Sequence, residues 1–181
     1  MELATGKYLN FLDDDDLFFA DHVETLVRGF EQNKEYKLAY TASFETKIEV
    51  SSREPKYEYE IKEIALVHNK PYSRIRLLTM NMFPIQAVMF EKEIFKTYGG
   101  MDLELDNLED WEMWARFAME NKYLYIPKVT SLYRVPAKMQ NYKERQEEID
   151  SYYKKAQDKI LSGQIKMKAI ELLKEDKNNR M

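Results

Sequence analysis

The sequence contains no cysteine and only two histidines, His22 and His68. Without cysteine the chain can form no disulfide, no thiolate zinc site and no cysteine nucleophile, which fits a reducing compartment. Two histidines so far apart in the sequence are too few for a typical zinc site. No apolar run approaches the roughly 20 residues of a membrane helix, and the N-terminus lacks the basic-then-apolar pattern of a signal peptide. These absences predict a soluble, cytoplasmic protein.

An excess of positive charge is also missing. The formal net charge is −4, so no overall basic field draws the chain onto nucleic acid, and we expect no nucleic-acid partner. A hydrophobic content of 44% and an aromatic content of 13% favour a folded globular chain over a disordered one. A length of 181 residues is enough for one domain with a sizeable core.

Strand-like and helix-like patterns alternate along the first half of the chain. Residues 7–12 have the pattern of a strand that enters a sheet and stops at four consecutive aspartates. Asp21 and Glu24 resemble a capping box. They precede a predicted helix that buries Val23, Leu26, Val27 and Phe30. The pattern also predicts a strand at 37–42 and one or two short helices within 57–66 and 72–78, broken by Pro71, while 43–55 is either a hairpin or a mobile loop.

The second half continues the alternation, which is typical of the α/β class. Residues 85–90 predict a buried strand, and 91–97 a short helix that ends at Gly99 and Gly100, where positive φ is expected. The tryptophan-containing stretch 109–120 predicts a largely buried helix. Two short strands are expected at 123–126 and 130–134, around Pro127. Residues 1–136 carry a net charge of −7 and form the main predicted unit; 137–181 carry +3 and form a predicted tail with helices at 141–161 and 165–173.

Four consecutive carboxylates, from Asp13 to Asp16, follow the first predicted strand. Such a run repels itself unless a cation or solvent relieves it. In open α/β sheets ligands bind beyond the carboxyl ends of strands, and the alternate residues Asp13 and Asp15 could share one hard divalent cation there. The alternative is a solvated acidic loop that caps the following helix.

Two further positions are candidates for chemistry. Glu109 and Asp110 begin the tryptophan-containing helix, where an apolar wall can raise a carboxyl pKa toward that of a general base. Acidic residues in a first helical turn also have a simpler role with the helix dipole. Arg134 ends the last predicted strand and could pair with a diphosphate, with one of the aspartates, or with another surface charge.

Three segments together resemble the motifs of inverting family 2 glycosyltransferases, which have the GT-A fold. Residues 4–16 read ATGKYLNFLDDDD and are similar to the family segment A-x-G-x-Y-h-x-F-L-D-x-D-D, where h is apolar. YGGMD at 98–102 followed by LEDWEMW at 108–114 resembles G-G-F-D-(x)n-E-D-x-x-h-W. YIP at 125–127 and SLYR at 131–134 resemble the closing segment h-I-P-x-x-h-x-x-Y-R. The resemblance covers residues 4–134.

This resemblance implies a partial GT-A fold, a mixed sheet flanked by helices with a helical tail. It implies that Asp13 and Asp15 bind Mn²⁺ or Mg²⁺ on the diphosphate of a nucleotide-diphosphate sugar donor, with Arg134 as a further donor-binding residue. Asp110, with Glu109 beside it, would be the base that deprotonates a carbohydrate or lipid-linked acceptor. The reaction implied is transfer of one sugar with inversion, in cell-surface polysaccharide or glycolipid synthesis; the Q-x-x-R-W signature of processive synthases is absent.

The sequence departs from the family at its start. Members of the family begin with a strand-helix-strand unit that holds the nucleotide, whereas Met1 here lies only a few residues before the aspartates. A fragment, or a chain completed by a partner, would explain this. The alternative function is therefore an inactive, truncated module that forms a homo-oligomer or binds a partner chain through the exposed edge of an incomplete sheet. The tail helices could pack on the core, cover the acceptor side or contact a membrane surface.

Overall fold

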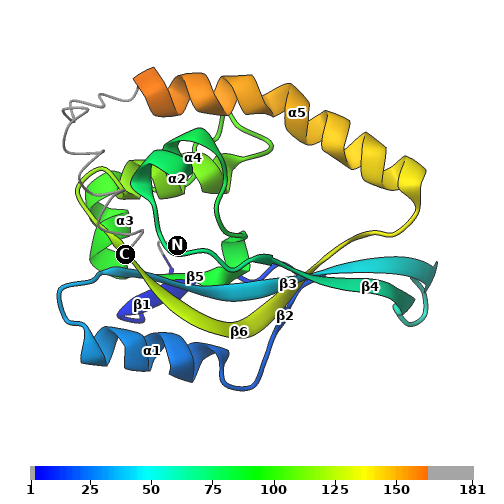
Figure 1. Cartoon of the computed structure of the whole chain (residues 1–181), viewed down its shortest axis with the longest axis horizontal. Helices are drawn as coiled ribbons and strands as arrows, with labels where there is room; N and C mark the ends of the chain where they lie inside the picture. The colour runs from blue at the N-terminus through cyan, green and yellow to red at the C-terminus, as the bar shows by residue number, and fades with distance from the viewer. Residues whose placement is uncertain (1–2, 163–181) are drawn as a thin grey trace.

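The computed structural model of the chain describes residues 3–162. The predicted α/β class is confirmed, since helices lie on both sides of a six-stranded mixed sheet (Figure 1). The predicted helix at 165–173, with the rest of the tail after residue 162, lies outside the described residues. The strands are β1 (Tyr8–Asn10), β2 (Leu17–Phe18), β3 (Leu38–Ser52), β4 (Glu58–His68), β5 (Val88–Glu91) and β6 (Tyr123–Pro136). The helices are α1 (His22–Gln32), α2 (Arg74–Thr79), the 3₁₀ turn η1 (Ile85–Ala87), α3 (Lys92–Tyr98), α4 (Glu109–Phe117) and α5 (Met139–Ser162).

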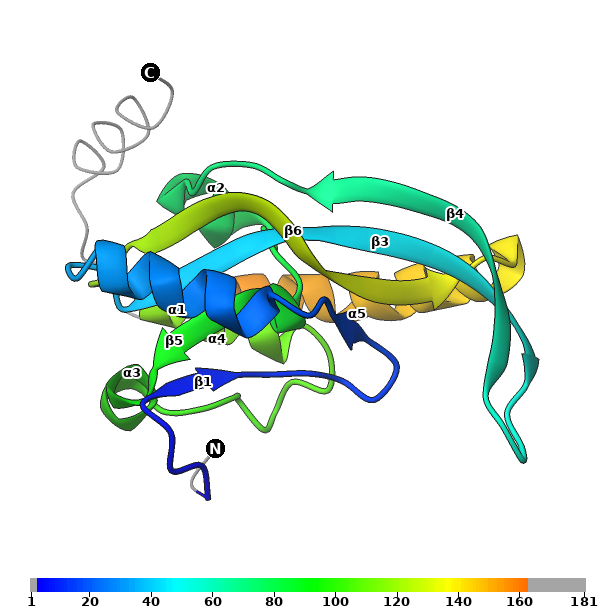
Figure 2. The same cartoon turned by 90° about the horizontal axis from the view of Figure 1, so that it is seen from below.

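Two long parallel strands, β3 and β6, form the centre of the sheet, whose strand order is β1-β5-β3-β6-β2, with β4 paired to β3. Figure 2 shows β3 and β6 running across the length of the molecule. Their pairing extends from Leu38 opposite Tyr123 to Ile48 opposite Pro136. The two strands predicted around Pro127 are thus one strand, and that expectation was wrong. Register shifts next to Ala42 leave Pro127 without a partner in β3, so the strand accommodates proline as an irregularity.

The ambiguous middle of the sequence is a long hairpin. β3 continues to Ser52, turns, and returns as β4, so residues 43–55 adopt the hairpin alternative. The helix expected within 57–66 is wrong, because this segment is β4; the helix expected at 72–78 is present as α2. Register shifts within the hairpin, one of them between Lys47 and Ile48, interrupt the two-residue alternation by which a strand is recognised.

The sheet has a separate hydrophobic cluster on each face. On one side α2, α4 and α5 cover the larger cluster, and α1 lies on the opposite side (Figure 1). The smaller cluster joins Leu26 and Phe30 of α1 to Ala39 and Met89 of the sheet. Val23 was expected in this interface but is 52% exposed. His22 is buried instead, because α1 turns that position of its first turn toward the sheet.

α4 is the most deeply buried helix of the larger cluster, as its sequence predicts. Trp111 and Trp114, the only tryptophans of the chain, are both 0% exposed. The Trp111 indole Nε1 donates to Leu77 O at 2.6 Å, and its ring lies 5.0 Å from that of Tyr153 on α5. Gly99 has φ of 82° at the end of α3, which confirms the expected stop. α5 buries Ala156 and Ile160 in its second half, as predicted.

Candidate functional site

The four aspartates form the loop between β1 and β2. β1 ends at Asn10 because the chain turns there, and the Asp16 amide closes the turn by donating to Asp13 O at 3.2 Å. Asp13, Asp14 and Asp15 are exposed, whereas Asp16 is half-buried. The expected capping box does not follow this loop: the Asp21 side chain makes no cap hydrogen bond and pairs with Lys128 of β6 instead.

Arg134 of β6 holds the aspartate loop in place. Its backbone amide donates to Asp16 Oδ1 at 3.2 Å, and its guanidinium donates to the backbone carbonyl of Asp15. The guanidinium also donates from Nη2 to the Tyr59 hydroxyl at 2.7 Å and lies 4.6 Å from the centre of the Tyr59 ring. Residues 118 positions apart in the sequence therefore meet at one place. Within residues 3–162 the Arg134 guanidinium contacts the backbone of the loop and the Arg134 amide contacts the Asp16 carboxyl, and Arg134 forms no ion pair with Asp13 or Asp15.

Asp110 lies at the beginning of α4 and is half-buried. Its Oδ1 accepts the Trp111 amide at 2.7 Å, and its Oδ2 accepts Asn81 Nδ2 at 3.0 Å. The pKa of Asp110 is raised to about 6, chiefly by burial and also by the negative charges of Glu109 and Asp13, against the hydrogen bonds from Asn81 and the Trp111 amide. The ring of Phe11, two residues before Asp13, lies 6.3 Å from that of Trp114, so the chain that leads into the aspartate loop packs against α4.

The loop carries an excess of negative charge. Although the Asp13 side chain is exposed, partial desolvation by the surrounding loop raises its pKa, and the neighbouring Asp15 and Asp14 charges raise it as well. Burial also raises the pKa of Asp16 to about 7, against the hydrogen bond from the Arg134 amide. Within residues 3–162, no ion pair neutralises the carboxylates of Asp13, Asp14 or Asp15. The same part of the chain has no group of three or more His, Cys, Asp or Glu side chains that could hold a metal by themselves.

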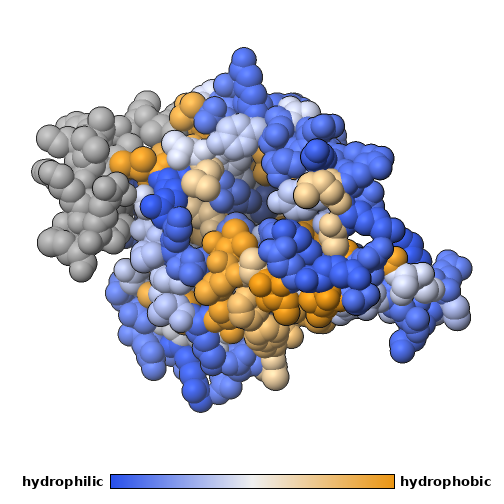
Figure 3. Space-filling view, turned by 45° about the vertical axis from the view of Figure 1, so that its right-hand side comes forward, coloured by the Kyte–Doolittle hydropathy of each residue, from blue (hydrophilic) through white to orange (hydrophobic). Residues whose placement is uncertain are grey.

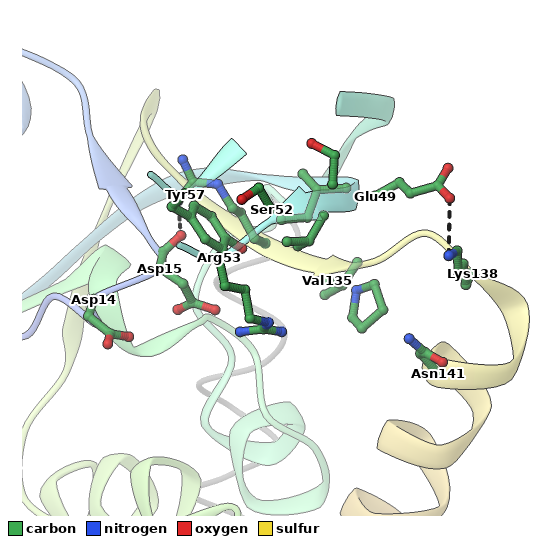
Figure 4. A pocket seen from close by; sticks show the side chains of 14 residues that line it. Asp14, Asp15, Glu49, Ser52, Arg53, Tyr57, Val135, Lys138 and Asn141 are labelled. Carbon is green, nitrogen blue, oxygen red and sulfur yellow. Dashed lines mark hydrogen bonds and ion pairs between the residues drawn. The ribbon is translucent and has the colours of Figure 1, made fainter. Parts of the chain in front are cut away.

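An open cavity of about 770 Å³ adjoins the loop. Figure 4 shows Asp14 and Asp15 on one side and Lys138 and Asn141, at the beginning of α5, on the other; Arg53 extends into the opening. Arg134 also lines it, whereas Asp13, Glu109 and Asp110 do not. The cavity lies along the last residues of β3 and β6, Ile48 to Ser52 and Arg134 to Pro136, close to the carboxyl ends at which open α/β sheets bind ligands.

Several residues of the site were not found from the sequence. Tyr59 and Tyr57 belong to the hairpin that was interpreted as helix, so their approach to Arg134 and to the cavity was not visible. Asn81, which donates to Asp110, lies in a connecting segment between α2 and η1 and has no motif around it. Only the contact itself identifies these residues.

A buried polar network supports β1 just before the aspartate loop. His22 Nε2 lies 3.0 Å from Asn10 Oδ1, His22 Nδ1 lies 2.7 Å from Thr130 Oγ1, and Thr130 Oγ1 lies 2.8 Å from Thr41 Oγ1. Asn10 Nδ2 in turn donates to Val88 O at 2.6 Å. The histidine thus joins α1, β1, β3 and β6. Burial lowers the pKa of His22 to about 4.

We expect the free energy of unfolding to fall as the pH is lowered from about 6.5 to about 4 through this histidine. In that range the unfolded chain binds a proton at His22 and the folded chain does not, so acid favours unfolding. Urea unfolding at pH 7, 6 and 5 measures the trend. NMR titration of the two imidazoles should show no protonation of His22 above pH 5. An imidazole at position 22 that titrates near 6.5 in the folded chain would contradict the prediction.

No protein-family model matches the sequence, and no curated protein sequence matches it. Within residues 3–162, no helix is both long enough and apolar enough to cross a membrane.

Proposed function

We propose that this chain is a metal-dependent glycosyltransferase that transfers a single sugar from a nucleotide-diphosphate sugar to an acceptor hydroxyl with inversion. One observation carries the proposal. Three segments that resemble successive glycosyltransferase motifs are far apart in the sequence and adjacent in the fold. Arg134 donates to Asp15 and Asp16, and Phe11, two residues before Asp13, packs on Trp114 of α4 with ring centres 6.3 Å apart. Asp15 and Arg134 line the cavity, and Asp13 and Asp110 lie outside its lining.

The carboxylates of the loop suit a hard divalent cation. Mg²⁺ and, by the same oxygen preference, Mn²⁺ are bound through one or two carboxylates together with substrate phosphates. Asp13 and Asp15 are exposed, and the pKa of Asp13 is raised partly by its neighbours' charges, so a cation there relieves repulsion. Two carboxylates without a third protein ligand fit a cation that arrives with the diphosphate. When bound, the cation would stabilise the charge that develops on the departing diphosphate.

The remaining chemistry belongs to Asp110 and Arg134. A pKa of about 6 leaves Asp110 mostly ionised at neutral pH, so its carboxylate can accept the proton of the acceptor hydroxyl. The acceptor oxygen then bonds to the anomeric carbon as the bond from that carbon to the diphosphate breaks. Asn81 and the Trp111 amide fix the orientation of the carboxylate. Arg134 fixes the aspartate loop and adds positive charge beside it.

Calorimetric titration of the chain with UDP, GDP and their sugars, with and without Mn²⁺, tests the proposal. We expect binding that requires the metal and that Asp15→Ala reduces at least about tenfold, since the variant loses one of two carboxylate ligands. Asp14→Ala is the matched control: it removes an adjacent exposed carboxylate at the variable position of the motif and should leave binding nearly unchanged. Failure to bind any of these nucleotides, or equal loss in both variants, argues against the proposal.

A second candidate function is association without catalysis, and the edge of the sheet at β1 favours it. β1 has three residues and, among the described residues, pairs only with β5. Its other edge leaves backbone groups available to a strand from a partner chain or a second copy. Sedimentation with and without nucleotide separates the two functions. If only a higher-mass species binds nucleotide, the chain acts as one part of a larger enzyme.

A further inference from the structure

His68, the second histidine of the chain, has no part in the site described so far. It ends β4 and is partly buried. Its Nε2 lies 3.2 Å from the hydroxyl of Tyr133 on β6, and that hydroxyl donates to Glu45 Oε2 on β3 at 2.6 Å. Figure 3 shows that polar residues cover most of the visible surface, around one apolar area. These three polar side chains are instead withdrawn from the surface and bond to one another across three strands.

The partners of His68 determine where its protons lie. Its Nδ1 lies 3.0 Å from Met82 O, a backbone carbonyl that can only accept, so Nδ1 carries the proton of this contact. Burial lowers the pKa of His68, against that hydrogen bond and the charge of Glu45, so the imidazole is neutral at pH 7. Its Nε2 is then an acceptor beside the Tyr133 hydroxyl. The ring is thus held between Tyr133 and the carbonyl of Met82.

That carbonyl belongs to the segment 80–84, which connects α2 to η1. Within residues 3–162, the contact from His68 is the only hydrogen bond to the backbone of residues 81–83. Phe83 packs in the core, with its ring centre 4.4 Å from that of Tyr40. Apolar packing is not directional, so it does not by itself fix the peptide group that joins Met82 to Phe83. The hydrogen bond from His68 supplies that direction.

Asn81, the residue before Met82, depends on this support. Its Nδ2 donates to Asp110 Oδ2 at 3.0 Å. Its Oδ1 is buried and has no hydrogen-bond partner in the described part of the chain, so no second bond holds the side-chain amide. The orientation of the amide toward Asp110 therefore depends on the backbone that carries it.

We propose that His68 and Tyr133 are positioning residues, which hold Asn81 against Asp110 through the carbonyl of Met82. The inference rests on the proposed function, because it names what supports the candidate base. It also gives a role to Tyr133, which precedes Arg134 in the last of the three motif-like segments and contacts neither the aspartate loop nor Asp110 directly.

The support has a measurable effect on the carboxyl of Asp110. Burial and the charges of Glu109 and Asp13 raise its pKa, whereas the hydrogen bonds from Asn81 and the Trp111 amide lower it. A variant in which Asn81 is no longer held in place loses one of the two opposing contacts. The pKa of Asp110 should then rise above about 6.

NMR titration of the Asp110 carboxyl tests the proposal without any substrate. We expect His68→Leu to raise its pKa by about half a unit or more. His68→Asn should leave the pKa nearly unchanged, because the asparagine Nδ2 can donate in place of the imidazole Nδ1. His22→Gln is the matched control: it removes the other histidine, which joins α1, β1, β3 and β6, and should not move the pKa of Asp110.

Two further variants keep the test sharp. Tyr133→Phe removes only the hydroxyl and should raise the pKa of Asp110 in the same direction; it replaces His68→Leu if circular dichroism shows that the latter does not fold. Asn81→Ala should give the full shift by itself. Adding His68→Leu to Asn81→Ala should then change little, because both substitutions act through one contact.

An Asp110 pKa that is the same in His68→Leu, Tyr133→Phe and the wild type overturns the proposal, whatever the chain catalyses. So does an equal shift in His68→Asn or in His22→Gln, which would indicate a general loosening of the fold. A chain that binds no nucleotide sugar would instead contradict the proposed function and leave this comparison of pKa values intact. The two failures are therefore distinguishable.

Discussion

Replacing Asp110 by asparagine is expected to lower the rate of the proposed sugar transfer by about 10³-fold while leaving nucleotide binding intact. The asparagine carbonyl can still accept the Trp111 amide, so the beginning of α4 should keep its geometry. The variant cannot take the proton of the acceptor hydroxyl. Initial rates with the donor identified by titration measure the effect. Glu109→Gln is the matched control and should change the rate far less, because Glu109 only modulates the pKa of its neighbour.

The pH dependence of the wild-type rate provides an independent check on the same residue. With a pKa of about 6, Asp110 is protonated in acid, and a protonated carboxyl cannot act as a base. The rate should therefore rise with pH up to about 6 and then become level. A profile without this inflection, or an Asp110→Asn variant as active as the wild type, would assign the proton transfer to another group.

Replacing Trp114 by alanine is expected to lower the free energy of unfolding by about 4 kcal/mol. The side chain is fully buried, and its ring lies 5.8 Å from that of Phe90 and 5.9 Å from that of Phe117. Its removal leaves a cavity that rigid aromatic neighbours cannot fill. Urea unfolding at neutral pH measures the loss.

The matched control for this core substitution is Val23→Ala on α1. Val23 is exposed, so the free energy of unfolding should change by no more than about 0.5 kcal/mol. Equal losses in the two variants would mean that α4 is not the centre of the core.

α4 could be predicted from the sequence because its residue types indicate a buried helix. Tryptophans and aliphatic residues at helical spacing have few ways to avoid the core, and the structure confirms Trp111, Met113, Trp114 and Phe117 as buried. Gly99 could be predicted for a similar reason, since its conformation needs a residue without a side chain. Local chemistry was sufficient in both cases.

The hairpin could not be predicted in the same way, because its pattern is misleading. Ile61, Ile64 and Ala65 have helical spacing, yet they lie on a strand whose bulge at Lys62 removes the alternation. Which neighbour β4 pairs with depends on β3, and no local signal encodes that pairing. Tertiary pairing overrode local preference here.

In the candidate site, the residues could be predicted from the sequence, whereas the contacts between them could not. Asp13, Asp15 and Asp110 were predicted from the sequence as site residues, and in the structure Phe11, just before the loop, packs on Trp114 of α4. The sequence did not predict that the Arg134 guanidinium donates to the backbone carbonyl of Asp15. Nor did it predict that Asn81 donates to the Asp110 carboxyl. Those contacts depend on how distant segments meet, which residue types alone do not determine.

The confinement of both tryptophans to α4 has a spectroscopic consequence. Indole emission from the folded chain comes from two rings on one helix, three residues apart and shielded from water, so it reports the environment of that helix alone. Trp111 is covalently next to Asp110 and touches α5 through Tyr153. The chain therefore carries an intrinsic optical probe between the candidate base and the C-terminal helix, and its signal can follow events there without any added label.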